Sequence, residues 1–175
     1  PFLQKDLFEV MDLVHRHGAT VSLITNATLI DESAARRLCG AMPTILNLSI
    51  DAATPAVFER VREGAKFSVV LENLDRLVRI KRETGAIFPI LSINMTLLRD
   101  TLEEVEGVID LARRWGVGEI VAQPVMFLPD SPDRSQAVTN REAQEALMRA
   151  RDRAREAGVR LRYQPVGQSL DTLAD

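Results

Sequence analysis

Hydrophobic residues along this chain follow two alternating spacings, and the alternation predicts an α/β fold. Six segments carry apolar residues three or four positions apart, as amphipathic helices do; they are 6–17, 31–38, 55–61, 67–83, 101–115 and 139–157. Between them lie short runs rich in β-branched residues, which predict strands at 20–24, 44–51, 87–98, 119–122 and 159–163. Strands that alternate with helices form parallel sheets with right-handed crossovers. These strands are too few to close an eight-stranded barrel, so we expect an open or partial barrel.

Polar residues near the helix ends predict local side-chain contacts. N-terminal caps are predicted for Asp31 alone and for the pairs Asp6–Glu9, Thr101–Glu104 and Thr139–Glu142. Gly85 and Gly116 are expected to end two of the helices. Glu59 and Arg62 lie three residues apart, and we expect them to pair on the surface or to brace the loop beside them.

The strand predicted at 44–51 is polar on one face only. Side chains two residues apart in a strand point to the same side, so Asn47, Ser49 and Asp51 share a face. A parallel strand between layers of helices is usually apolar on both faces. In α/β barrels and open α/β sheets, ligands bind at the carboxyl ends of the strands. Because this strand becomes more polar toward its carboxyl end, the pattern favours a ligand site there.

Polar residues also end the neighbouring predicted strands. The residues at these ends are Thr25, Asn26, Ser49, Asp51, Asn94, Thr96 and Gln123. Any one of them could simply cap the helix that follows, which is a common use of Ser, Thr, Asn and Asp. Their recurrence over four successive strands favours a shared rim for a ligand rich in hydroxyl and amino groups. A lyase or isomerase is a weaker alternative, because it would need Lys, His or paired carboxylates there, and Asp51 is the one carboxylate.

Composition narrows the expected partners. The 175 residues are 46% hydrophobic and 27% charged with a net charge of −3, so we expect one globular domain and no nucleic-acid partner. No apolar run reaches the ~20 residues that span a bilayer, so we expect no membrane partner. The single cysteine, Cys39, excludes an internal disulfide and favours a cytoplasmic location. Because the chain starts at Pro1 rather than Met, we interpret it as a piece of a longer polypeptide.

Several motifs, taken in order, resemble those of radical S-adenosylmethionine (SAM) enzymes. Pro1-Phe2-Leu3 is similar to the end of their Gly-Gly-Glu-Pro segment, and residues 22–29 to the third-strand Thr-Asn-Gly-Thr-Leu motif. Residues 48–52 resemble the fourth-strand Ser-Leu-Asp-Gly motif. Residues 67–77 resemble the Ser-Phe-x-x-Val-x-x-Asn-Ile helix, and residues 92–100 resemble the fifth strand.

The resemblance implies a partial (β/α)6 TIM-like barrel, present here as an incomplete fragment with about five parallel strands. Residues 1–165 would be part of the core domain, without its N-terminal cluster-binding strand. Residues 166–175 would begin a linker or a following segment. Tyr163-Gln164-Pro165 is similar to members that continue into a cysteine-rich SPASM-type extension.

The resemblance also implies a cofactor. Such enzymes cleave SAM reductively at a [4Fe–4S] cluster held by three cysteines, and the resulting 5′-deoxyadenosyl radical abstracts hydrogen from the substrate. Ser49 and Asp51 would hold the ribose hydroxyls or the amino-acid moiety of SAM, with Asn94 beside them. The remaining cofactor-binding candidates are Thr25 and Asn26, and Gln123, Val125 and Met126 near the adenine. The expected partners are a small-molecule or peptide substrate and a reductant protein such as a ferredoxin or flavodoxin.

This sequence departs from the family pattern in two ways. The cysteine triad is absent and Cys39 does not occupy its position, so the cluster ligands would lie outside this chain, and the chain alone is predicted to be inactive. Ala27 and Ala52 stand where glycine is usual, and alanine disfavours positive φ. A cluster-less relative that acts as a binding or scaffold module is therefore the alternative.

Overall fold

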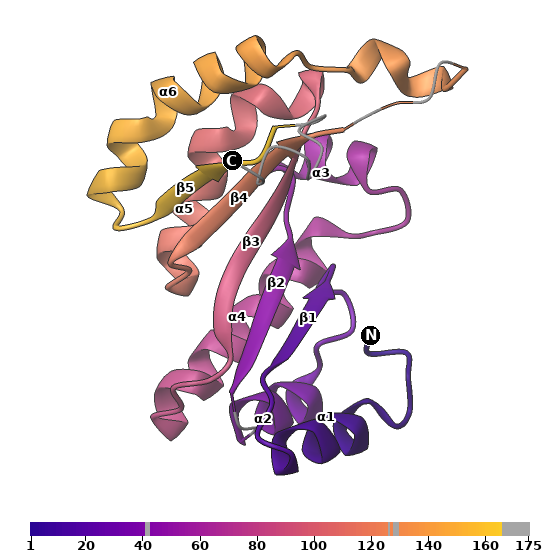
Figure 1. The fold of residues 1–175 in the computed structure, drawn as a ribbon, viewed down its shortest axis with the longest axis vertical. Helices are drawn as coiled ribbons and strands as arrows, with labels where there is room; N and C mark the ends of the chain where they lie inside the picture. Colours follow the sequence, from indigo (N-terminus) through magenta and orange to yellow (C-terminus); the bar gives the residue numbers. More distant parts are fainter. Residues whose placement is uncertain (41–42, 126, 128–129, 166–175) are drawn as a thin grey trace, which may run out of the picture.

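The computed structural model describes residues 1–40, 43–125, 127 and 130–165 (Figure 1). The α-helices are α1 (Leu7–Arg16), α2 (Glu32–Gly40), α3 (Pro55–Val61), α4 (Phe67–Thr84), α5 (Val105–Trp115) and α6 (Asn140–Glu156). The 3₁₀ helices are η1 (Arg99–Glu104) and η2 (Pro132–Gln136). The strands are β1 (Val21–Thr25), β2 (Thr44–Ser49), β3 (Ile90–Leu97), β4 (Glu119–Pro124) and β5 (Arg160–Tyr163). Residues 166–175, predicted to begin a linker, lie outside this part of the chain.

The five strands form one parallel sheet in the order β1-β2-β3-β4-β5, with β1 and β5 at its edges. Every strand therefore pairs with the next strand in sequence, and each connection contains one or more helices. Repeated right-handed crossovers of this kind place the helices on the same side of the sheet. Among these helices, α2 packs against α4 and α5 packs against α6. The predicted open α/β sheet of about five parallel strands is confirmed.

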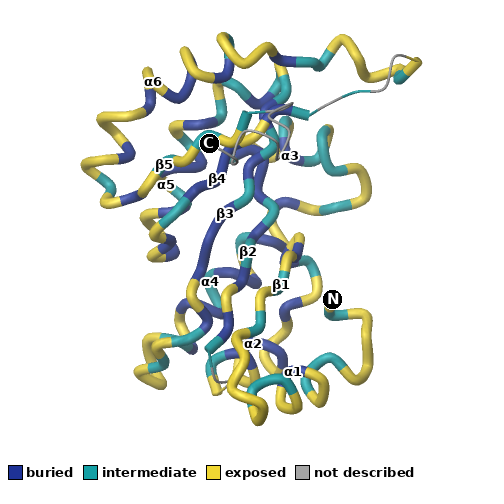
Figure 2. The backbone as a smooth tube through the Cα atoms, viewed as in Figure 1, coloured by how far each residue is buried: buried dark blue, intermediate teal, exposed yellow. Residues whose placement is uncertain are grey.

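The two faces of β2 differ as the sequence predicts. Leu46, Leu48 and Ile50 are fully buried on the face toward the helices. Asn47 and Ser49 lie on the other face and are only partly buried. Figure 2 shows the same contrast across the molecule, with buried positions along the central strands and exposed ones on the outer helical turns. The sheet therefore has one face covered by helices and one open face.

Several predicted helix ends are confirmed by hydrogen bonds. Asp31 Oδ1 accepts a hydrogen bond of 2.8 Å from Ala34 N at the start of α2. At the start of α6, Thr139 Oγ1 accepts from Glu142 N while Glu142 Oε2 accepts from Thr139 N. Gly85 ends α4 with a φ of 66°, in the left-handed region that glycine adopts without steric cost.

Three local predictions are wrong. Residues 99–104 form a 3₁₀ turn, and the buried Thr101 hydroxyl donates to Thr96 O (2.8 Å), while Glu104 makes no bond back to it. The Asp6 side chain makes no capping hydrogen bond to α1. The third strand begins at Ile90 rather than at residue 87. In the first case, Glu104 bonds instead to a distant turn, a partner that sequence spacing does not indicate.

Candidate functional site

Unpaired polar side chains gather on the open face of the sheet near the strand ends. Ser49 of β2 is in register with Asn94 of β3, and Thr96 of β3 is in register with Gln123 of β4. Residues in register on parallel strands point to the same side of the sheet, so these four side chains share one face. Within the described ranges, none of the four side chains has a hydrogen-bond partner. The face therefore presents hydroxyl and amide groups that are free to bind a ligand.

Asp51, just beyond β2, is in contrast fully engaged within the protein. Its carboxylate is 2% exposed, and Oδ1 accepts a hydrogen bond of 2.7 Å from Thr96 N. Oδ2 lies 2.6 Å from Arg62 Nε, although this buried nitrogen makes no aligned hydrogen bond. The Asp51–Arg62 contact is thus an ion pair, and it fixes Arg62, which keeps 27% of its side-chain exposure.

Arg62 lies between two hollows at the rim of the sheet. The smaller hollow, of about 330 Å³, is lined by residues that include Asn26, Ser49, Arg62 and the first three residues of the chain. The larger one, of about 720 Å³, includes Asp51, Arg62 and Thr96 in its lining. One partly exposed cation therefore borders both spaces.

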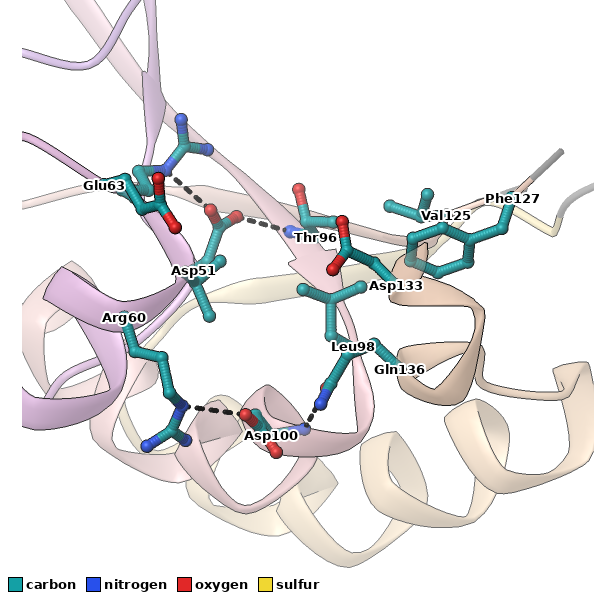
Figure 3. A pocket seen from close by; sticks show the side chains of 12 residues that line it. Asp51, Arg60, Glu63, Thr96, Leu98, Asp100, Val125, Phe127, Asp133 and Gln136 are labelled. Atoms are coloured by element: carbon teal, nitrogen blue, oxygen red, sulfur yellow. Dashed lines mark hydrogen bonds and ion pairs between the residues drawn. The ribbon is translucent and has the colours of Figure 1, made fainter. Parts of the chain in front are cut away.

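The larger hollow has a charged side and an apolar side, and the Asp133 carboxylate lies next to the apolar side (Figure 3). Arg60 of α3 and Asp100 of η1 meet across its border, with Nε 2.8 Å from Oδ2. Val125 and Phe127, which follow β4, lie on the other side. The hollow can therefore accept a ligand with both an apolar ring and polar groups. Met126, also predicted to lie near this site, is outside the described residues.

The turn after β1 contributes to the smaller hollow. Thr25 borders it, but this residue is 4% exposed and its hydroxyl accepts a hydrogen bond of 3.1 Å from Ala27 N. Asn26 is exposed, and its Oδ1 accepts from Thr28 Oγ1 at 2.9 Å. Asn26 can therefore still donate from its amide nitrogen, whereas the Thr25 hydroxyl is engaged within the turn.

Sequence reasoning gave one contributor to this site the wrong partner, and it missed or misassigned two others. Arg62 pairs with Asp51, and Glu59 instead accepts hydrogen bonds from Lys66 and from Phe67 N. These two donors lower the pKa of Glu59. Phe127 was not predicted because no motif marked it, and the role of Glu104 was misassigned. Of these three residues, only Arg62 has a sequence feature that marks it as a candidate site residue. It is a cation two residues before a glycine, in the loop that follows α3.

The described residues do not provide a metal site. They contain no group of three or more His, Cys, Asp or Glu side chains that could hold a metal ion. Cys39 is a free thiol, and burial raises its pKa. A [4Fe–4S] cluster therefore does not fit the side chains that this part of the chain offers.

An open parallel sheet with polar strand ends at one rim defines an α/β domain of the partial-barrel class. The sequence model of the Radical SAM superfamily matches residues 1–112, and this chain belongs to that superfamily. It is 26% identical over 116 residues to the mycofactocin maturase MftC of Mycobacterium ulcerans, covering 66% of this chain and 30% of that protein. It is 23% identical over 134 residues to a probable GTP 3′,8-cyclase of Methanococcus maripaludis, covering 76% and 42% respectively.

Solved structures share the fold. The SAM-bound SuiB of Streptococcus suis matches with a TM-score of 0.73 and 13% identity, over 97% of this chain and 38% of SuiB. Native anSMEcpe with bound AdoMet and the Kp18Cys peptide matches with a TM-score of 0.63 and 17% identity, over 91% and 46%. These likenesses support the partial-barrel architecture. The chain spans less than half the length of each of these proteins.

Proposed function

We propose that this chain supplies the SAM-binding rim of a radical SAM enzyme. The observation that carries the proposal is the row of unpaired groups on the open face, at Ser49, Asn94 and Thr96. Hydroxyl and amide groups are suitable partners for a ribose diol. The Arg62 guanidinium would pair with the carboxylate of the methionine moiety, and the apolar side of the larger hollow would take the adenine.

The residues present fit SAM but not the cluster. In this superfamily a [4Fe–4S] cluster supplies the electron that cleaves SAM to a 5′-deoxyadenosyl radical for hydrogen abstraction. We propose that its ligands come from a part of the protein outside these 175 residues, and that a ferredoxin- or flavodoxin-type protein provides the electron. The residues of this chain bind and orient SAM. Asp51 acts through Arg62 rather than by touching SAM.

We further propose that the larger hollow admits the substrate, a peptide. SuiB has been crystallised with its precursor peptide SuiA, and the structure of anSMEcpe contains the Kp18Cys peptide. The hollow of about 720 Å³ is much larger than the adenine that its apolar side would hold, so it leaves room beside the adenosyl group for an extended chain. A small-molecule substrate is the other possibility, because one relative is named as a GTP cyclase.

The test uses the full-length protein of the gene that encodes this chain. After anaerobic reconstitution with iron and sulfide, SAM binding is measured by calorimetry and 5′-deoxyadenosine is measured after addition of dithionite. We expect both signals. Ser49→Ala and Asn94→Ala should each weaken SAM binding about five- to tenfold, the value of one hydrogen bond, whereas Ser68→Ala, at an exposed position of α4, should not. A protein that binds SAM poorly and contains no cluster would favour the scaffold alternative.

A further inference from the structure

The turn after β1 contains a conformationally strained residue. Ala27 has a φ of 61°, a left-handed conformation that costs an alanine free energy because its Cβ is crowded. Ala27 is also fully buried, so the turn cannot relax by exposing it. Among the described non-glycine residues, no other has a positive φ. Backbone strain of this kind persists only where surrounding contacts enforce it.

Asn73 of α4 provides those contacts. Its Nδ2 donates hydrogen bonds to Ala27 O (2.9 Å) and to Thr28 O (3.0 Å). Arg76 Nη1 donates to Asn73 Oδ1 (2.7 Å) and to Ile30 O (3.2 Å), so the amide has its nitrogen directed at the turn. Asn73 is 7% exposed. A buried side chain whose donors are both used by strained backbone is well placed to hold that backbone.

We infer that Asn73 is a positioning residue for the ligand site. The residue it acts on is Asn26, which precedes Ala27 and borders the smaller hollow together with Ser49 and Arg62. If the turn moved to a relaxed conformation, Asn26 would leave the hollow. The inference rests on the proposed function only in naming SAM as the ligand. The clamp, meaning the two hydrogen bonds from Asn73 Nδ2 to the turn, does not depend on that function.

The test compares four forms of the full-length protein: wild type, Asn73→Asp, Ala27→Gly and the double variant. Asn73→Asp keeps the size of the side chain and its acceptor toward Arg76, but it replaces both donors to the turn by a carboxylate oxygen that repels Ala27 O and Thr28 O. Asn73→Asp should weaken SAM binding about fivefold, since the strained turn is then populated less. A glycine at position 27 adopts positive φ without that cost, so the double variant should bind within about twofold of Ala27→Gly alone. Glu72→Ala, an exposed neighbour on α4, is the matched control.

Hydrogen–deuterium exchange over residues 25–30 gives a second readout that does not need SAM. Asn73→Asp should speed exchange there, and Ala27→Gly should reverse the effect. Unchanged SAM affinity in Asn73→Asp, or a loss that Ala27→Gly does not reverse, would overturn the inference, because a merely stabilising role predicts one of these results. If the wild type does not bind SAM but the exchange pattern is as expected, the proposed function fails and the clamp stands.

Discussion

Asp51 connects β2, β3 and Arg62 at the rim, so its substitution perturbs the rim most directly. Two variants separate its two contacts. Asp51→Ala removes both the acceptor for Thr96 N and the partner of Arg62. Asp51→Asn keeps a carbonyl oxygen that can accept from Thr96 N, but it removes the negative charge. The two variants should therefore destabilise the protein to different extents.

The structure allows both costs to be estimated. A hydrogen bond to a charged group contributes about 1.5–3 kcal/mol. The loss of the hydrogen bond from Thr96 N therefore accounts for the larger part of the stability lost in Asp51→Ala. Removal of one partner from a fully buried ion pair costs ~3–5 kcal/mol. Because Arg62 keeps 27% of its exposure, water can replace much of that pairing, and ~1 kcal/mol is the better estimate for this part. We expect a loss of about 3 kcal/mol for Asp51→Ala and about 1 kcal/mol for Asp51→Asn.

Urea denaturation at constant pH measures these differences. The slope of the free energy of unfolding against urea should stay constant, which shows that only stability has changed. Asp152→Ala removes a 70%-exposed carboxylate on α6 and should change stability by less than ~0.5 kcal/mol. A loss below ~1 kcal/mol for Asp51→Ala would refute the assignment of Asp51 as an anchor. Equal losses in the two variants would place the stabilisation in the charge rather than in the hydrogen bond.

Three further predictions concern other contacts that hold the fold together. Glu104→Ala should cost ~2 kcal/mol of unfolding free energy, because Glu104 accepts hydrogen bonds from Ala53 N (2.7 Å) and from Thr54 N. The matched control, Glu103→Ala at an exposed position, should cost little in the same denaturation assay. Gly107→Ala should lower the melting temperature and cost ~1–3 kcal/mol, since the added Cβ would lie 2.6 Å from Ala53 Cβ. Hydrogen bonds from the backbone N–H and the hydroxyl of Thr139, the N-cap residue of α6, hold the pKa of Glu142 below its ordinary value of 4.5. The stabilising contribution of the Glu142 carboxylate is therefore complete above pH 4.5, and it disappears as the pH falls through the lower pKa of the folded protein. Urea midpoints measured from pH 6 to 3 should therefore fall less steeply for Glu142→Gln than for the wild type, and identical slopes would contradict the assignment.

The elements of the fold could be predicted because their signals are local. The helical stripe of α4 and the alternation along β2 depend only on spacing within one element, and the structure has both. The alignment of Ser49 with Asn94 follows from the same alternation in two strands, once the strands are known to be parallel neighbours. Pattern reasoning therefore extends to shared faces of a sheet.

The partners of charged side chains could not be predicted, because they come from distant parts of the chain. Glu104 bonds to a turn 51 residues earlier, and its short-range spacing to Thr101 suggested a different role. Likewise, Arg62 reaches Asp51 rather than Glu59, the residue one helical turn away. Long charged side chains reach whichever unpaired groups the fold brings near, and a single sequence does not specify those groups.

The division of polar residues at the rim follows from the cost of burial. A buried carboxylate without partners loses much more hydration free energy than a hydroxyl or an amide near solvent. Asp51 is therefore paired on both oxygens, whereas Ser49 and Asn94, which are only partly buried, can remain unpaired. The residue that looks most like a ligand-binding group in the sequence is for this reason the one least free to bind. Neutral residues that precede it on the same face, and those in register with them, are better candidates, and the same argument applies wherever a parallel strand ends in an acidic residue.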